Sequence, residues 1–298
     1  MTVTHDAAYD HDAPDNWMEQ LMQQTAAKPG DTTPQAGLQR IRAVIENAIL
    51  NQPRSLQKRI GPSEIGTPCD HCLAAKLAGW KSTERDVPWL PFIGTAVHAQ
   101  IEQMFIDEAA KVYGDDPAGG VPYRAEHKTM VGVIDGVEIW GSTDLVDFEA
   151  AMTVDWKVVG VTTLRTAKAG PSQVYRVQQH LYAKGWNDAG YPIRHVAIAY
   201  LPRNDMSLSS AVWWTEPYNE QIAVDALARA NKFALNIRAL RSISDEAVDA
   251  WITSLPRHNR QWNPDLAAGK ECQDCKRFPD NPVVVAVQDS FLDGLAHS

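Results

Sequence analysis

Hydrophobic residues recur at helical spacing in several stretches of the chain. The clearest is residues 94–113 (GTAVHAQIEQMFIDEAAKVY), which predicts an amphipathic helix with Val97, Ile101, Met104 and Phe105 on one side. The same spacing predicts further helices from Gly37 to about Gln52, from near Cys69, and over residues 171–190, 217–241 and 244–254.

The middle of the chain instead alternates apolar and polar residues, the pattern of half-buried strands. It predicts strands over residues 128–134, 137–148, 151–159, 194–201 and 210–215. The Asp135-Gly136 dipeptide between the first two predicts a tight hairpin turn. Helices, strands, a helix, two strands and more helices in this order favour an α/β fold, in which a mixed β-sheet is flanked by helices on both faces.

Composition is that of an ordinary globular chain. Of the 298 residues, 44% are hydrophobic and 22% are charged, and no apolar run is long enough to cross a membrane. The N-terminus lacks the basic and then apolar segments of a secretory signal. We therefore expect a cytoplasmic protein, in the host cytoplasm if it is phage-encoded, with no membrane association.

Residues 1–36 are acidic and rich in Ala, Thr, Pro and Gln, which predicts a disordered tail. We expect residues 37–298 to form a single domain. Its core would span about residues 90–215, and the segments 53–80 and 217–280 would close around that core.

Charge is distributed unevenly along the chain. The net charge is −9, and residues 1–20 supply −5 of it through five acidic residues and no Lys or Arg. From Trp156 to Asn187 there is no Asp or Glu, although this stretch holds Lys157, Arg165, Lys168, Arg176 and Lys184. Such a basic stretch is either a surface for nucleic-acid phosphates or a solvated helix face.

Three charged residues on neighbouring predicted strands carry the clearest chemical pattern. Asp155 and Lys157 are two residues apart, so their side chains share one face of a strand. Asp144 lies among apolar neighbours on the preceding strand, where a carboxylate needs a partner. Two carboxylates can hold a divalent cation, and a nearby ammonium can orient an attacking water. A buried Asp–Lys ion pair is the alternative interpretation.

Two helical pairs add to this pattern. His98 and Glu102 are four residues apart on one predicted helix, and Gln178 and Tyr182 are four apart on another, so each pair shares a helix face. An imidazole beside two carboxylates would complete a metal site and would favour Mn²⁺ over Mg²⁺. Taken singly, each pair is typical of packing or of a helix surface.

In this order and spacing, the motifs GTAVHAQIE (94–102), GSTDLVD (141–147), VDWK (154–157) and QQHLY (178–182) resemble the RecB-like branch of the PD-(D/E)XK nuclease superfamily. The resemblance implies a restriction-endonuclease-like core and a Mg²⁺- or Mn²⁺-dependent deoxyribonuclease. It implies metal ligation by His98, Asp144, Asp155 and the carbonyl of Trp156, and a catalytic role for Lys157 with the two aspartates. Glu102 would assist this site, and Gln178 and Tyr182 would lie on the substrate side. Together with Arg165, Lys168 and Arg176, they form the predicted DNA-binding set.

The four cysteines form two pairs, Cys69-x-x-Cys72 and Cys272-x-x-Cys275, which suggests metal or cluster ligation in a cytoplasmic chain. Cluster-bearing relatives, such as the CRISPR-adaptation nucleases and the AddB type, place one cysteine before the nuclease core and three after it. The division here is two and two. The resemblance implies a 4Fe-4S cluster, and two CxxC units also suit Zn²⁺. Either centre would be a Cys₄ staple joining the N- and C-terminal segments.

The resemblance, which extends to exonucleases of actinobacteriophages, implies an exonuclease of phage or bacterial DNA recombination or replication. One alternative is a structure-specific endonuclease that cuts forks or flaps. An alternative of another class is a non-catalytic DNA-binding module stabilised by a Cys₄ metal. The expected partner is DNA, as ends, single strands or forks. No G-x-x-x-x-G-K-[ST] motif is present, so any unwinding would come from a partner such as a helicase, and a recombinase is a further possible partner. None of the ten tryptophans is assigned to DNA stacking.

Overall fold

The computed structural model describes residues 33–51, 60–80, 87–113, 122–257 and 275–278. Most of the predicted acidic tail, and Cys272, lie outside these residues. Within the described ranges, no helix is both long and apolar enough to cross a membrane.

The chain divides into two compact units, Met1–Gln57 with Asp86–Trp89, and Lys58–Arg85 with Leu90–Ser298. In the first unit, the helix α2 (Pro34–Leu50) begins three residues before the predicted start. Thr33 explains this start, because its Oγ1 accepts a 3.3 Å hydrogen bond from the Ala36 N–H and Pro34 follows in the first turn.

The second unit contains one five-stranded mixed sheet, as expected for the predicted α/β fold. Its strands lie in chain order and comprise β1 (Tyr123–Ile134), β2 (Val137–Asp147), β3 (Met152–Val159), β4 (His195–Pro202) and β5 (Val212–Pro217). Only β3 and β4 pair in parallel, and the other three pairs are antiparallel. The parallel pair needs a crossover connection, which the helices between these two strands provide.

The predicted hairpin turn is confirmed at the tip of β1 and β2. Asp135 has φ of 49° and Gly136 has φ of 81°, the two positive values that a tight type I′ turn requires. The helix α8 (Glu220–Arg241) holds this tip. Asn231 Oδ1 accepts the Asp135 N–H at 2.7 Å, and Arg238 Nη1 lies 2.7 Å from Asp135 Oδ1.

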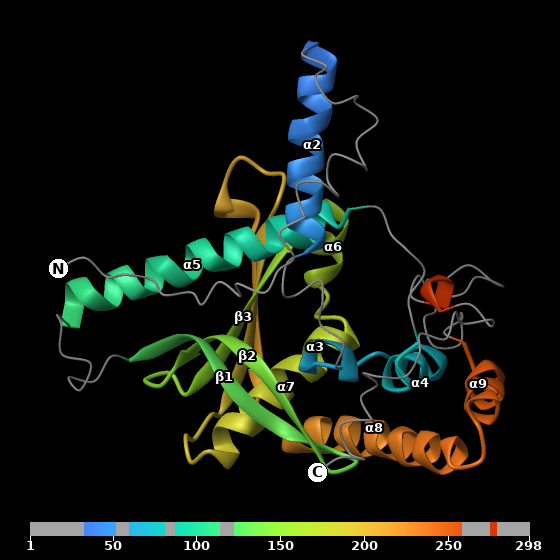
Figure 1. The fold of residues 1–298 in the computed structure, drawn as a ribbon. Helices are drawn as coiled ribbons and strands as arrows, with labels where there is room; N and C mark the ends of the chain where they lie inside the picture. The colour runs from blue at the N-terminus through green and yellow to red at the C-terminus, as the bar shows by residue number, and fades with distance from the viewer. Residues whose placement is uncertain (1–32, 52–59, 81–86, 114–121, 258–274, 279–298) are drawn as a thin grey trace, which may run out of the picture. The chain divides into compact units, whose positions relative to one another are not determined.

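Helices cover both faces of the sheet, as the sequence predicts (Figure 1). The helix α5 (Trp89–Tyr113) covers one face, where its Ile101 and Phe105 pack on residues of β2, β3 and β4. The rings of Phe105 and Trp156 stack with centroids 5.7 Å apart. Met104, expected on the same side, is 57% exposed. The less exposed side of α5 is formed by positions 98, 101, 102 and 105, and Met104 lies outside it.

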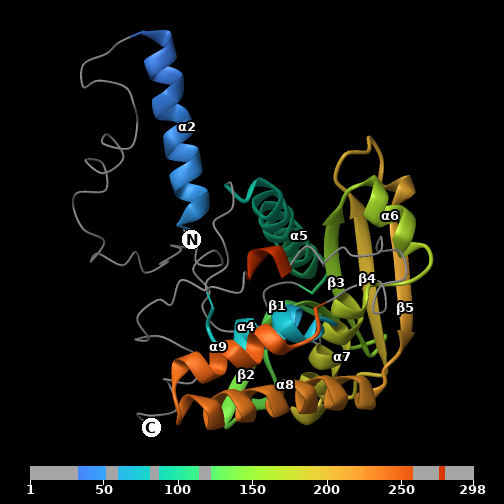
Figure 2. The ribbon, with the colours of Figure 1, turned by 90° about the vertical axis from the view of Figure 1, so that its right-hand side faces the viewer.

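The opposite face is covered by α6 (Val161–Ala167) and α7 (Gln173–Asp188), toward the viewer in Figure 2. There Ala183 and Trp186 of α7 pack on Val146 and Val196. Close approach of α7 to the hairpin requires a small residue, since a Cβ on Gly185 would lie 2.5 Å from the Met130 carbonyl oxygen.

A second helical layer extends beyond the hairpin. It comprises α3 (Pro62–Ile65), α4 (Asp70–Leu77), α8 and α9 (Asp245–Ser254), which share one apolar core with the distal ends of β1 and β2. Arg229 of α8 fixes the segment before α4 by donating to the carbonyl oxygens of Thr67 and Pro68 and pairing with Asp70. This layer positions the first cysteine pair.

Candidate active site

The strands β2 and β3 separate at the predicted catalytic residues. Their backbone pairing joins Asp147, Val146 and Leu145 to Met152, Thr153 and Val154. Continued by one residue, the register would pair Asp144 with Asp155, but no such backbone pair is present in this part of the sheet. Instead, Oδ2 of Asp144 accepts a 2.8 Å hydrogen bond from the Trp156 N–H. At this point the Asp144 side chain therefore accepts the hydrogen bond that the backbone of a paired strand would otherwise accept.

Asp155 and Lys157 project together, as their i, i+2 spacing predicts. Asp155 is 1% exposed, and its Oδ2 lies 2.5 Å from Lys157 Nζ. Its Oδ1 has no hydrogen-bond partner within the described part of the chain. Burial, together with the charge of Asp144, raises the pKa of Asp155 to about 6, against the opposing charge of Lys157. A buried carboxylate oxygen without a partner is costly, and a bound cation would satisfy it.

Lys157 is held from a second direction by an aromatic ring. Its Nζ lies 4.9 Å from the ring centroid of Tyr175 on α7, within the range of a cation–π interaction. Ion pair and ring together restrict a side chain that is otherwise flexible. The ammonium is thereby fixed beside Asp155.

His98 reaches the same site from α5. Its Nδ1 lies 3.4 Å from Asp144 Oδ2. Burial disfavours protonation of the ring, but the hydrogen bond and charge of Asp144 outweigh burial and raise the pKa of His98. A helix on one face of the sheet and two strands thus supply the three predicted side-chain ligands.

Glu126 belongs to this group, and sequence reasoning missed it. It lies opposite Asp144 in the β1–β2 register, between the pairs Ala125–Leu145 and His127–Thr143. One ligand atom each from His98, Glu126 and Asp144 lies within 4.8 Å of the others. The predicted strand begins at residue 128, five residues after the observed start of β1 at Tyr123, and therefore leaves Glu126 out.

The backbone and the surroundings of Glu126 are both unusual. Its φ is 45°, a left-handed value that is uncommon for a residue other than glycine. Burial raises the pKa of its carboxyl, assisted by the charges of Asp144 and Glu102 and opposed by a 2.7 Å hydrogen bond from Ser142 Oγ. Strained backbone and crowded titratable groups are both typical of functional sites.

The donor set fits a hard divalent cation. Carboxylate oxygens are the ligands preferred by Mg²⁺, and an imidazole extends the preference to Mn²⁺. The unsatisfied Oδ1 of Asp155 and the close acids at Glu126 and Asp144 both favour such an ion. The residues that could hold it are His98, Glu126, Asp144, Asp155 and the carbonyl of Trp156.

The remaining predicted substrate residues lie in different environments. Gln178 and Tyr182 are each 5% exposed, and Gln178 Nε2 donates to the Tyr182 hydroxyl at 3.4 Å. Oε1 of Gln178 has no hydrogen-bond partner among the residues the structure describes. Glu102 is half-buried on α5, one turn after His98. Arg165 and Lys168 are exposed at α6.

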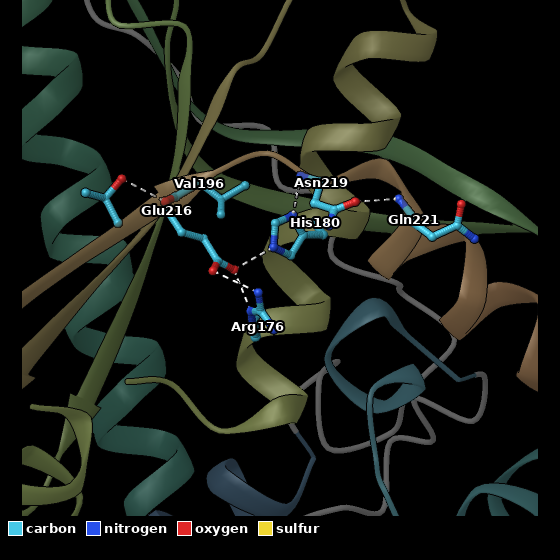
Figure 3. Close-up of polar contacts among 7 residues, drawn as sticks. Arg176, His180, Val196, Glu216, Asn219 and Gln221 are labelled. Atoms are coloured by element: carbon cyan, nitrogen blue, oxygen red, sulfur yellow. Dashed lines mark hydrogen bonds and ion pairs between the residues drawn. The ribbon is translucent and has the colours of Figure 1, made fainter. Parts of the chain in front are cut away.

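Arg176 is engaged with a neighbouring strand (Figure 3). Its guanidinium donates to both carboxylate oxygens of Glu216 on β5, at 2.6 and 2.9 Å. His180 Nε2 lies 2.7 Å from Glu216 Oε1, and the Asn219 N–H donates to His180 Nδ1 at 3.3 Å. Because Nδ1 accepts, the proton of a neutral His180 is on Nε2. The charge of Arg176 is therefore already paired within the protein.

Three cysteines meet in the second unit and link its N- and C-terminal segments. Sγ of Cys275 lies 3.4 Å from Sγ of Cys69 and 3.6 Å from Sγ of Cys72, and all three are buried. Cys272 lies outside the described residues. Bonds of about 2.3 Å to a tetrahedral zinc would separate thiolate sulfurs by roughly 3.8 Å, close to these distances. A 4Fe-4S cluster bonds each thiolate to a different iron and would require the sulfurs to move apart.

No family model matches this chain, and no curated protein matches it. The chain is similar to the solved structure titled "Crystal structure of SSO0001", with a TM-score of 0.42, 13% identity, and coverage of 64% of this chain and 85% of that chain. It is also similar to an alkaline exonuclease (LHK-Exo) from Laribacter hongkongensis, with a TM-score of 0.41, 10% identity, and coverage of 65% and 95%. At these scores, neither likeness assigns a family or an activity to the chain.

Proposed function

We propose that this protein is a divalent-metal-dependent DNA nuclease. The observation that carries the proposal is the group formed where β2 and β3 separate, in which Asp144 lies close to His98 and Glu126, and the buried Asp155 pairs with Lys157. The four sequence motifs shared with RecB-like nucleases, in the same order, support it independently.

The ligands of the cation would be Asp144, Asp155, His98 and the carbonyl of Trp156, with Glu126 as a further acid. When bound, a divalent cation polarises the phosphoryl group, activates a water and stabilises the leaving oxygen. Lys157, fixed beside Asp155, orients the attacking water and offsets negative charge on the phosphate. Glu102 acts from outside the ligand set, through its charge on Glu126.

We propose an exonuclease that acts on DNA ends during phage or bacterial recombination or replication. A fork or flap endonuclease would use the same catalytic residues. The two are separated by incubating the protein with Mg²⁺ or Mn²⁺ and single-stranded, blunt duplex and forked DNA, each labelled at the 5′ or the 3′ end. An exonuclease releases mononucleotides or short oligonucleotides from one labelled end. Cleavage confined to the fork junction would favour the endonuclease, and no cleavage of any substrate would contradict the nuclease proposal.

We further propose that Cys69, Cys72, Cys272 and Cys275 bind one metal centre. The sequence resemblance favours a 4Fe-4S cluster, whereas the sulfur separations favour Zn²⁺. Protein purified without oxygen decides between them. About four irons per chain, with broad visible absorption, identify the cluster. One zinc per chain in colourless protein identifies the single ion.

A further inference from the structure

One face of the β1–β2 hairpin remains open to solvent beyond the candidate active site. On β2, Ile139 packs in the helical core, and a Cβ on Gly141 would lie 2.6 Å from Pro62, so these positions face the helices. The alternating positions Trp140 and Ser142 face the other side. Trp140 is 53% exposed there, a large indole with little protein covering it.

The matching positions of β1 complete this face. Lys128 is paired with Ser142, and Met130 is paired with Trp140, so each lies beside its partner on the same side. Lys128 is exposed and Met130 is half-buried. Thr129 and Val131 point the other way and are buried. A cation and an aromatic ring thus follow one another along the open face of the hairpin.

This face continues directly from the candidate active site. Ser142 Oγ donates to Glu126, and Glu126 lies in the group with His98 and Asp144. Strands advance about 3.4 Å per residue, so Lys128 with Ser142 lies ~7 Å beyond Asp144, and Trp140 with Met130 lies ~14 Å beyond it. The spacing of ~7 Å between successive positions on this face is comparable with the separation of neighbouring nucleotides in extended single-stranded DNA. Figure 1 shows the hairpin continuing past α5 toward α8.

We propose that this open face binds one DNA strand next to the scissile phosphate, with Lys128 contacting a phosphate and Trp140 stacking on a base. The inference rests on the proposed nuclease function and deepens it, because it makes a single-stranded segment part of the substrate. Aromatic stacking accepts every base, which suits a nuclease that reads no sequence.

The indole of Trp140 is oriented before DNA binds. Its Nε1 donates a 2.9 Å hydrogen bond to Oε2 of Glu138, two residues away on the same side of β2. This bond restricts the ring, so less side-chain entropy is lost when a base stacks on it. It also occupies one oxygen of the only acidic side chain next to Trp140 on its own strand.

Trp213 provides a matched control. It is also an exposed tryptophan on a strand, 67% exposed, but it lies on β5 at the opposite edge of the sheet. It is therefore away from the hairpin face defined by Lys128, Met130, Trp140 and Ser142. Neither Trp140 nor Trp213 belongs to the proposed metal ligands.

The test measures binding without chemistry. Fluorescence anisotropy in EDTA is recorded for a labelled 12-nucleotide single strand with wild type, Trp140→Ala, Trp140→Phe and Trp213→Ala. Trp140→Ala should bind about 5- to 150-fold more weakly, the range for losing one stacked base, whereas Trp140→Phe should retain most of the affinity. Trp213→Ala should match wild type. Lys128→Ala should reduce the salt dependence of binding by about 0.7 in the logarithmic slope.

Single-stranded DNA with one abasic site locates the base that stacks on Trp140. One position near the bound end should weaken wild-type binding when its base is absent, and the same abasic site should have no effect on Trp140→Ala. Equal affinity of Trp140→Ala and Trp213→Ala, in proteins of equal thermal stability, would overturn the inference. That result would leave the nuclease proposal intact if the wild type still cleaves DNA. Absence of cleavage by the wild type would instead count against the nuclease proposal.

Discussion

The Trp156 N–H donates its hydrogen bond to Oδ2 of Asp144, at 2.8 Å, and not to the backbone of β2. Asp144 is therefore both a structural cap for β3 and a candidate metal ligand, since its carboxylate is fixed at the point where the two strands separate. With Trp156 N–H engaged in this way, the adjacent Asp155 and Lys157 remain directed together on the face covered by α7.

Glu126 is predicted to contribute to divalent-metal binding. Glu126→Gln keeps the size of the side chain but removes its charge, so Mn²⁺ should bind about tenfold or more weakly, as measured by isothermal titration. Glu138→Gln, an exposed acid on the same hairpin, is the control and should leave Mn²⁺ affinity unchanged. Equal Mn²⁺ affinity for the two variants would exclude Glu126 from the site.

The exposed cations of α6 are predicted to contact DNA phosphates. Replacing Arg165 and Lys168 by alanine should weaken binding of any DNA sequence and should lower the salt slope by about one unit per lost contact. Arg176→Ala should have a smaller effect on this slope, because Glu216 already pairs with its guanidinium. Should the double variant retain the wild-type slope in a binding titration, the acid-free stretch is only a solvated surface.

The cysteine centre is predicted to stabilise the fold. Cys275→Ser, and likewise Cys272→Ser, should lose the bound metal and lower the melting temperature by about 10 °C or more, because metal binding energy contributes to folding. A chelator should lower the melting temperature of the wild type but not that of the variants. Full thermal stability of Cys275→Ser, with no metal in the wild type, would refute the centre.

His180 is predicted to make stability depend on pH. Burial lowers its pKa below the ordinary value of 6.5, despite its hydrogen bond to Glu216, so the unfolded chain binds a proton at a pH where the folded protein does not. The stability from neutral His180 is complete above about pH 6.5 and is lost as the pH falls from there toward the folded pKa.

The measurement is the melting temperature between about pH 7.5 and pH 5.5. His180→Gln should lose less stability than the wild type over this interval. The control, His195→Gln, replaces an exposed histidine and should follow the wild-type curve. Parallel curves for wild type and His180→Gln would show that His180 does not titrate in this range.

Much of the sheet could be predicted from local patterns. Alternation identified all five strands to within a few residues, apart from the first five residues of β1, and Asp135-Gly136 identified the hairpin turn. These features depend on the alternation of side chains along a strand and on the residues of the turn, and both can be recognised from a few consecutive residues. The start of α2 lies three residues before the one that apolar spacing predicts, because the Thr33 cap sets it and a cap leaves no apolar signal.

Glu126, the part of the candidate site that the sequence did not predict, was missed for a different reason. Glu126 lies 18 positions before Asp144, and only the antiparallel register of β1 and β2 brings the two together. Pairing between Arg176 and Glu216 likewise joins α7 to β5 across 40 positions. Such contacts depend on strand order and register, and neither can be inferred from the spacing of residues within one motif.

The most direct test of the central claim is cleavage of end-labelled DNA in Mg²⁺ or Mn²⁺ by wild type, Lys157→Ala and Asp155→Asn. The control variant is Asp147→Asn, whose carboxylate accepts the Ala150 N–H in the turn between β2 and β3 and lies outside the proposed site. We predict metal-dependent cleavage by the wild type and Asp147→Asn, and a loss of about 100-fold or more, equivalent to ~2.7 kcal/mol of activation free energy, in the other two. Cleavage at the wild-type rate by folded Asp155→Asn or Lys157→Ala would contradict the account.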